Sequence, residues 1–260
     1  MKKIFALLLA LVMMMTFAAC NTSGENESTG STEARFDPAA KSEGVMTYAE
    51  YAAAAMDSEV VIECYVQATQ SWWFDSEVNH GKITVYAQDP DGAYFLYEMT
   101  CTEEDAAKLI AGTKIKVTGY KSEWSGEIEV TDATFEFVES QTWIAEAMDA
   151  TALLGTDSLI DHQNKLVSFK GMTVVAANDE GDAFLYKWNG SGSAGDDLYF
   201  NVSIDGKTYT FCVESYLTGD GTDVYEAVEA LNVGDVIDLE GFLYWYNGAQ
   251  PHITSVTAAN

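Results

Sequence analysis

The feature that most constrains the fold of this chain is an internal repeat. The segment GTKIKVTGYKSEWSG at 112–126 aligns without a gap with GDVIDLEGFLYWYNG at 234–248. Both copies share three glycines, and aliphatic residues alternate with polar ones before the second glycine. Alternation with a period of two is typical of a half-buried β-strand, and similarity over a long offset indicates repeated structural units. We therefore expect two tandem units of mainly β structure.

The similarity extends upstream of these segments. Aspartate–glycine turns precede alternating strands within 89–99 and 203–213, and a first strand is expected at 60–66 and at 166–174. Short helices are predicted before the two units, at 47–56 and 142–154, and the first has Thr47 and Glu50 at the spacing of a capping box. A second helix is predicted late in each unit, at 102–112 and 222–234. Each unit thus runs three strands, a helix, a strand, a turn and a last strand.

This order resembles the oligonucleotide/oligosaccharide-binding (OB) fold, a five-stranded Greek-key barrel, with the helix here between strands 3 and 4. The resemblance covers residues 57–138 and 164–257. It implies two OB-like domains, 45–140 and 141–260, each with a leading helix. The second unit departs from the pattern by a glycine-rich insertion at 187–197, expected to be a long loop. A different small β-barrel or a sandwich is the structural alternative.

The N-terminus, MKKIFALLLALVMMMTFAAC, has two lysines followed by an apolar run too short for an ordinary transmembrane helix. Two alanines then precede Cys20. This arrangement resembles the lipobox of bacterial lipoproteins, although Phe17 stands where leucine is usual. The resemblance implies that residues 1–20 are a lipoprotein signal peptide ending at Cys20, with cleavage before this residue and lipidation of its thiol. An ordinary secretory signal is the alternative.

Residues 21–44 are rich in Ser, Thr, Gly and Glu and have no hydrophobic periodicity, which predicts a flexible tether. Together with the lipid on Cys20, this tether predicts an exported protein. It would be anchored to the outer side of the bacterial cytoplasmic membrane, at the cell surface. The chain as a whole therefore resembles bacterial envelope lipoproteins that carry tandem OB-like domains.

The charge of the chain argues against nucleic-acid partners. It contains 41 acidic and 13 basic residues, for a net charge of −28, and its one arginine is Arg35. Nucleic-acid binders need lysine and arginine for phosphate contacts. Lys114 and Lys116 are expected to lie opposite Glu127 and Glu129 across a hairpin, as a charge pairing and not a phosphate track. Nucleic acid is therefore an unlikely partner.

The sequence contains no motif that indicates catalysis, a cofactor or a metal. Its three histidines lie in different predicted elements, so we do not expect an enzyme. Cys64, Cys101 and Cys212 each lie in or beside an apolar run, where a free cysteine packs as a small hydrophobic residue. A disulfide between Cys64 and Cys101 is the alternative.

Aromatic residues are concentrated where this fold binds ligands. The resemblance implies that the loops joining strands 1 to 2 and 4 to 5 flank the ligand face. In the last repeat segment, period-two geometry places Leu243 and Trp245 inward and Tyr244 and Tyr246 outward. The candidate ligand-binding residues are Trp72, Trp73, Phe74, Trp124, Trp188, Tyr244, Trp245 and Tyr246.

Three functions are consistent with these rings. Rings beside carboxylates suit sugars, so the first hypothesis is a non-enzymatic binding protein for a neutral ligand, with a glycan favoured. The alternative is a structural or assembly component of an envelope protein complex, in which the rings pack domains or partners together. Binding of single-stranded nucleic acid is third, because stacking on rings there requires a basic groove as well.

Overall fold

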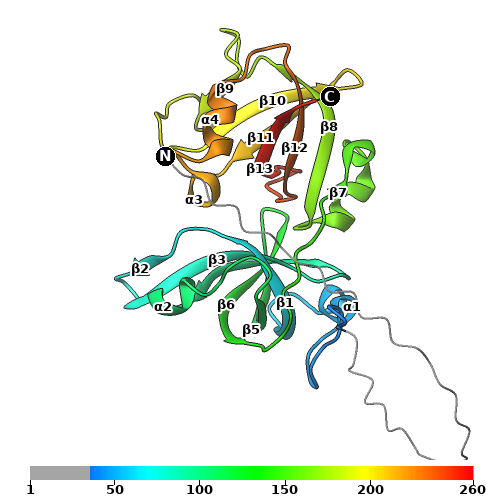
Figure 1. The fold of residues 1–260 in the computed structure, drawn as a ribbon, viewed down its shortest axis with the longest axis vertical. Helices are drawn as coiled ribbons and strands as arrows, with labels where there is room; N and C mark the ends of the chain where they lie inside the picture. The colour runs from blue at the N-terminus through cyan, green and yellow to red at the C-terminus, as the bar shows by residue number, and fades with distance from the viewer. Residues whose placement is uncertain (1–35, 260) are drawn as a thin grey trace, which may run out of the picture. The chain divides into compact units, whose positions relative to one another are not determined.

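The computed structural model describes residues 36–259 (Figure 1). Cys20, the expected signal peptide and most of the expected tether lie outside the described residues. Within them the chain forms two closed five-stranded barrels, one in each half. None of the helices in residues 36–259 is long and apolar enough to cross a membrane.

The first barrel has the strand order β1-β5-β6-β4-β3 and is closed by pairing of β1 with β3. Strands β4 and β6 are parallel and the other neighbours are antiparallel. A short strand, β2, extends the sheet beside β3, and helix α2 lies between β4 and β5. The bounds are β1 Glu59–Thr69, β2 Trp73–Asp75, β3 His80–Gln88, β4 Ala93–Thr100, α2 Glu103–Ala106, β5 Lys114–Trp124 and β6 Glu127–Phe137.

The second barrel repeats this arrangement as β8-β12-β13-β11-β10, closed by β8 with β10, with β11 and β13 parallel. Helices α3 and α4 lie between β11 and β12, and the short strand β9 pairs with β10. The bounds are β8 Leu166–Val175, β9 Phe184–Tyr186, β10 Leu198–Ile204, β11 Lys207–Val213, α3 Ser215–Thr218, α4 Asp223–Glu229, β12 Val236–Phe242 and β13 His252–Ala258. Both barrels therefore have the OB strand order, and the predicted fold class is confirmed.

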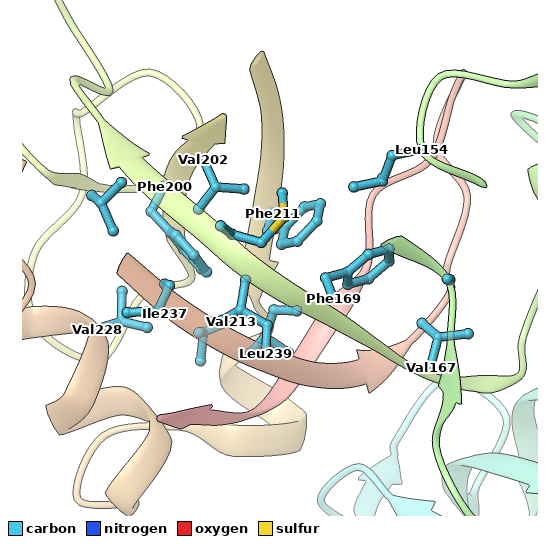
Figure 2. Packing of buried hydrophobic residues seen from close by; sticks show 14 of the residues in the cluster. Leu154, Val167, Phe169, Phe200, Val202, Phe211, Val213, Val228, Ile237 and Leu239 are labelled. Atoms are coloured by element: carbon cyan, nitrogen blue, oxygen red, sulfur yellow. The ribbon is translucent and has the colours of Figure 1, made fainter. Parts of the chain in front are cut away.

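Alternating side chains build a separate core in each barrel. In the second barrel Phe169, Phe200 and Phe211 meet inside the strands, and Val228 of α4 closes one end (Figure 2). In the first barrel the equivalent interior is filled by aliphatic residues of all five strands, among them Ile62, Val85, Leu96, Ile115 and Val130. Inward apolar positions alternate with outward polar ones along β12, where Ile237 and Leu239 are buried and Glu240 is exposed.

The two leading segments differ. Helix α1 (Tyr48–Ala53) forms as predicted, with the Thr47 hydroxyl accepting from Glu50 N at 3.2 Å and the Glu50 carboxylate accepting from Thr47 N at 2.8 Å. The α-helix predicted over 142–154 is wrong. That segment holds strand β7 (Met148–Asp149), parallel to β8, and the 3₁₀ turn η1 (Thr151–Leu153).

The reason for this difference lies in backbone partners supplied by the barrels. Trp143 N donates to Gly112 O at 3.3 Å, and Ala145 N donates to the Gln67 side chain at 2.8 Å. Backbone amides committed to neighbours in this way cannot make the i to i−4 bonds of an α-helix. A further 3₁₀ helix, η2 (Asp157–His162), precedes β8.

The segment just before α1 is held against the first barrel. The Lys41 ammonium contacts Asp89 and donates to Glu63 O at 2.6 Å, while the Lys114 ammonium donates to Ala40 O at 2.8 Å. The folded part of the chain thus begins before residue 45, where the tether was expected to end.

The three described cysteines are free and buried. Cys64 and Cys101 both pack in the core of the first barrel without forming the alternative disulfide.

Candidate ligand-binding groove

Aromatic residues from both barrels pack against each other. Phe242, at the end of β12, stacks on Tyr86 of β3 with ring centroids 4.5 Å apart and planes 21° apart. Phe95 of β4 meets the edge of the Tyr86 ring at 5.1 Å, and all three rings are buried. Phe242 points outward from its own barrel and packs into the other barrel. The interpretation of some rings as packing between domains is thus correct for Phe242.

A second contact joins equivalent turns of the repeat. The rings of Trp124 and Tyr246 are in tilted contact with centroids 5.2 Å apart, and Asn247 N donates to Ser125 O at 2.7 Å. In the repeat alignment Trp124 corresponds to Tyr246 and Ser125 to Asn247. Matching positions of the two units therefore contact each other at these turns.

Polar side chains reinforce this junction. The buried Glu127 carboxylate accepts a hydrogen bond from Trp245 N at 2.8 Å. The Gln163 side chain donates to Gly126 O at 2.8 Å and accepts from Ile128 N at 3.2 Å. The β5–β6 hairpin of the first barrel is therefore bound along its edge by the second barrel.

The charge pairing predicted across this hairpin is wrong. A register shift between Thr118 and Tyr120 places Lys116 opposite Glu136, and the Lys114 ammonium pairs with Glu63 on β1 at 2.9 Å. Glu127 and Glu129 instead lie in the junction. Burial raises the pKa of Glu127 to about 8 and that of Glu129 to about 7. The turn at Ser125 and Gly126 pairs Glu127 with Trp124 and Glu129 with Ser122, whereas Lys114 and Lys116 lie at the far end of β5.

Two cavities beside the ring contacts share one wall. The first cavity, of about 540 Å³, lies over β3, β4 and the end of β11, and the second, of about 560 Å³, lies over β10, β11 and the segment after β12. Glu214, Tyr244 and His252 line both, and we call the two cavities together the groove. The first is also lined by Gln70, Ser71, Trp73, Thr84, Phe95, Tyr97, Glu98 and Tyr216, and the second by Trp124, Trp188, Asp197, Tyr199, Cys212, Tyr246 and Gln250.

The shared wall is rigidly built. Tyr244 stacks on His252 with centroids 4.2 Å apart and meets the edge of Phe95 at 5.3 Å. The Tyr86 hydroxyl and His252 Nδ1 share a hydrogen bond of 2.6 Å, and burial lowers the pKa of His252 to about 3 and raises that of Tyr86. His252 is therefore neutral in the shared wall.

Carboxyl groups dominate the electrostatics of the groove. Burial, with Asp197 nearby, raises the pKa of Glu214 to about 7, and its carboxyl oxygens accept from the Gln70 amide at 3.1 Å and Tyr216 N at 3.3 Å. Glu98 forms an ion pair with Lys82 at 2.9 Å. None of the described residues that line the groove is lysine or arginine. The groove is thus polar and acidic between aromatic walls.

The structure brings together five of the eight candidate residues. Trp73 lines the first cavity, Tyr244 lines both, and the second cavity is lined by Trp124, Trp188 and Tyr246. The insertion at 187–197 forms the expected loop, closed by Lys187 N donating to Asp197 O at 2.8 Å.

The other three candidates lie elsewhere. Trp72 and Phe74 line a separate cavity of about 460 Å³ with Phe135 and Phe137, because alternation along β2 turns them away from Trp73. Trp245 packs on the core of the second barrel, and Leu243 lies inside that core, both as the period-two count predicted. The rings of the first barrel thus do not form one cluster at one end, as the sequence suggested.

Several groove residues were missed by sequence reasoning, above all Asp197, Glu214 and His252. The sequence does contain a signal that relates Asp197 to Glu214. Asp197 and Glu214 lie at equal distances from the turn at Asp205 and Gly206, and the observed register pairs Leu198 with Val213 beside them. Counting back from the turn would have placed both carboxyl groups at the same end of the β10–β11 hairpin. His252 had no such signal, because its role depends on Tyr86 of the other barrel.

Residues 36–259 contain no group of three or more His, Cys, Asp or Glu side chains that could hold a metal ion. The groove presents rings, carboxyl groups and the Gln70 and Gln250 amides among its lining residues. This arrangement can stack a flat or apolar ligand face and exchange hydrogen bonds with polar groups around its edge.

The fold defines a protein with tandem OB-like barrels. No family model and no curated protein matches the sequence. Among solved structures, the chain is similar in fold to a murine DNA-binding protein bound with double-stranded DNA, with a TM-score of 0.36, 12% identity, and coverage of 77% of this chain and 96% of that one. The tetrameric p202 HIN2 domain gives a TM-score of 0.32, 12% identity, and coverage of 79% and 96%.

A replication protein A heterotrimer bound to single-stranded DNA gives a TM-score of 0.33, 9% identity, and coverage of 84% of this chain and 51% of that one. At these TM-scores the likeness says nothing about what this chain binds.

Proposed function

We propose that this protein is a non-enzymatic binding protein whose groove takes a saccharide without acidic groups. The observation that supports this most is the shared wall of Tyr244, Glu214 and His252, with exposed tryptophans on either side of it. A wall common to two adjoining cavities suits a ligand made of consecutive similar units.

The lining chemistry favours sugars. Flat rings stack on the apolar faces of pyranoses, while carboxyl groups and the Gln70 and Gln250 amides bond to hydroxyls. Each cavity falls within the range of roughly 300–1,000 Å³ typical of small-ligand sites. Two of them in line can hold more than one sugar ring. The carboxyl groups disfavour uronic, sulfated or phosphorylated sugars, because nothing lining the groove offers a compensating lysine or arginine.

The test uses a soluble form beginning at residue 36, titrated with a panel of neutral oligosaccharides while tryptophan fluorescence is followed. Trp73→Ala and Trp124→Ala should each weaken binding about 10-fold, because each removes an exposed ring from the groove. Phe74→Ala is the matched control, since Phe74 is also an exposed ring but lines the separate cavity. Equal weakening by all three variants, or no binding to any saccharide, would overturn the proposal.

Single-stranded nucleic acid is the second candidate, because exposed rings such as Trp73, Trp124 and Trp188 would also stack bases. The carboxyl groups of the groove and the net charge of −28 work against it. Titration with a single-stranded oligonucleotide in the same assay distinguishes nucleic acid from a saccharide as the ligand. Saturable binding that weakens steeply with salt, and that Trp124→Ala reduces, would replace the saccharide by nucleic acid.

An assembly role in an envelope complex is supported by a different surface. Phe74 and Phe137 are exposed rings beside Trp72 and Phe135 on the first barrel, which suits a protein contact. For this role, Phe74→Ala and Phe137→Ala should release partners that crosslink to the wild-type protein in membranes. The groove variants should not.

We also propose that the protein is displayed on the outer side of the bacterial cytoplasmic membrane through a lipid on Cys20. The N-terminal pattern of lysines, apolar run and Ala-Ala-Cys supports this. Cys20→Ser should move the protein from the membrane fraction to the soluble exported fraction and abolish incorporation of labelled fatty acid. Retention of the label in this variant would contradict the proposal.

A further inference from the structure

We infer that the second cavity is a site for an organic cation, so that the bound saccharide carries an amine on the unit that occupies it. The saccharide part of this inference rests on the proposed function, whereas the cation site rests on the cavity itself. The cavity combines aromatic walls, two carboxyl groups and no lysine or arginine among its described lining residues.

The walls form an aromatic cage. The ring centroids of Trp124 and Tyr246 are 5.2 Å apart with their planes inclined at 34°. Tyr244 forms the side shared with the first cavity, and Tyr199 and Trp188 are the two other aromatic lining residues besides His252. Trp188 is 74% exposed and has no ring partner among the described residues, so its face is open to a ligand. Ring faces carry negative charge density and attract ammonium groups, most strongly when the cation leaves water.

Two carboxyl groups face this cage without a counter-ion. Asp197 accepts two hydrogen bonds on Oδ1, from Ser215 N at 2.9 Å and from the Ser215 hydroxyl at 2.7 Å. Glu214 accepts from Gln70 and Tyr216, which are neutral donors. These contacts position the carboxyl groups but supply no positive charge.

The elements around the cavity supply no positive charge to these two carboxyl groups either. The nearby Lys187 ammonium pairs with Asp196, 3.3 Å away, and not with Asp197. His252 is neutral, and the first barrel contributes Trp124 to the lining, with Glu127 and Glu129 further along the β5–β6 hairpin. Every charged side chain that lines the cavity is therefore acidic, which matches a cationic ligand and opposes an anionic one.

Binding of a cation in this cavity is therefore thermodynamically linked to the ionisation of Glu214. A cation in the cage favours the carboxylate form of Glu214, so binding below the pKa of about 7 requires release of a proton. The affinity for a cation of fixed charge should accordingly rise as the pH increases from 6 to 8. A neutral ligand should show no such dependence.

The experiment uses two sets of probes by titration calorimetry. Tetramethylammonium, whose charge does not change with pH, tests the cage itself at pH 6 and pH 8. A glucosamine oligomer and its fully N-acetylated counterpart of equal length, compared at pH 6, test the saccharide. We expect tetramethylammonium to bind more tightly at pH 8, and the amine-bearing oligomer to bind about 10-fold more tightly than the acetylated one.

Glu214→Gln should weaken tetramethylammonium binding about 10-fold at pH 8 and remove its pH dependence, because the amide keeps the shape of the side chain without its charge. Trp124→Ala should weaken it at both pH values, and because Trp124 also contacts Tyr246 across the junction, thermal unfolding of the variant checks that the fold is kept. Glu136→Gln, an exposed carboxylate on β6, is the matched control and should change nothing.

The outcomes separate the two proposals. Neutral oligosaccharide binding with no advantage for the amine, and no tetramethylammonium binding, would overturn the cation site and leave the proposed function standing. Tetramethylammonium binding that depends on Glu214 and Trp124, without binding of any oligosaccharide, would support the cation site and overturn the saccharide. Binding of none of the probes would overturn both.

Discussion

At the scale of single residues, Glu127 lies where acceptors outnumber donors. Its Oε1 atom is buried without a hydrogen-bond partner, and so is the Oδ1 atom of Asn164 at the same junction. Only the Oε2 atom of Glu127 is satisfied, by Trp245 N. A buried acceptor without a donor is costly. A proton on Glu127 reduces that cost, which agrees with its raised pKa of about 8.

This residue predicts the pH dependence of stability. The folded pKa of about 8 exceeds the ordinary value of 4.5, so between these values the folded state holds a proton that the unfolded state has lost. Stability should therefore fall as the pH rises from 4.5 to 8. Glu127→Gln removes this loss and adds a donor, and should raise the free energy of unfolding at pH 8 by roughly 2–4 kcal/mol.

Urea unfolding at pH 5 and pH 8 checks the prediction. The increase in the free energy of unfolding caused by Glu127→Gln should be much larger at pH 8 than at pH 5. Glu240→Gln, which changes an exposed carboxylate on β12, should leave both values unchanged. A variant less stable than the wild type at pH 8 would show that Glu127 acts as an ionised group.

At the scale of elements, the turn between β5 and β6 fixes the contact between the repeats. Ser125 and Gly126 have φ values of +53° and +90°, the pattern of a two-residue turn that favours glycine. A Cβ atom on Gly126 would lie 2.8 Å from Trp245 Cδ1. The glycine thus serves both the turn and the close approach of the second barrel.

Gly126→Ala should therefore destabilise the protein more than strain alone explains. Gly234→Ala is the matched control, since its φ of +100° gives similar strain while nothing lies within 4 Å of the added Cβ. We expect a loss of about 1 kcal/mol in the control and about 1–2 kcal/mol more in Gly126→Ala. Thermal unfolding of both variants provides the comparison, and equal losses would mean that Trp245 moves aside freely.

At the scale of the whole described chain, the two barrels behave as a packed pair. Tyr86, Phe95 and Phe242 form a small third core of their own. The equivalent turns at 124–126 and 246–248 add a contact between repeated positions.

This packing predicts energetic coupling between the barrels. Tyr86→Ala and Phe242→Ala should show an interaction energy of about 1 kcal/mol or more in a double-mutant cycle, because their rings stack directly. Tyr86→Ala combined with Phe169→Ala, a ring inside the second barrel, should be additive. Chemical denaturation measures both cycles. Additivity in the first cycle would mean that the barrels do not depend on this stack.

Much of the fold could be predicted because it depends on local patterns. Alternation, the repeated glycines and the Thr47–Glu50 capping box each act over a few residues, and the structure follows them. The segment 142–154 could not be predicted, because its helical pattern is overridden by partners on Gln67, Gly112 and β8, far away in sequence. Propensity is a weak guide where tertiary hydrogen bonds compete.

The groove was only half predictable for a related reason. Aromatic residues in predicted loops could be identified from the sequence, and five of the eight candidates line the groove. The different cavities that Trp72 and Trp73 line could not be predicted, because the two residues are adjacent, with Trp72 just before β2 and Trp73 at its start. Glu214 and His252 acquire their properties from Asp197, Gln70 and Tyr86, and two of these belong to the other barrel. No single-barrel pattern contains that information.

The fastening of the segment before α1 has a mechanical consequence. Lys41 and Ala40 are held to Glu63 on β1, to Asp89 at the end of β3, and to Lys114 on β5. A pull on the chain from the N-terminal side would reach these buried polar contacts before it reached α1. The pulling force would be distributed over three strands of a closed barrel. The short helix α1 would not bear this force.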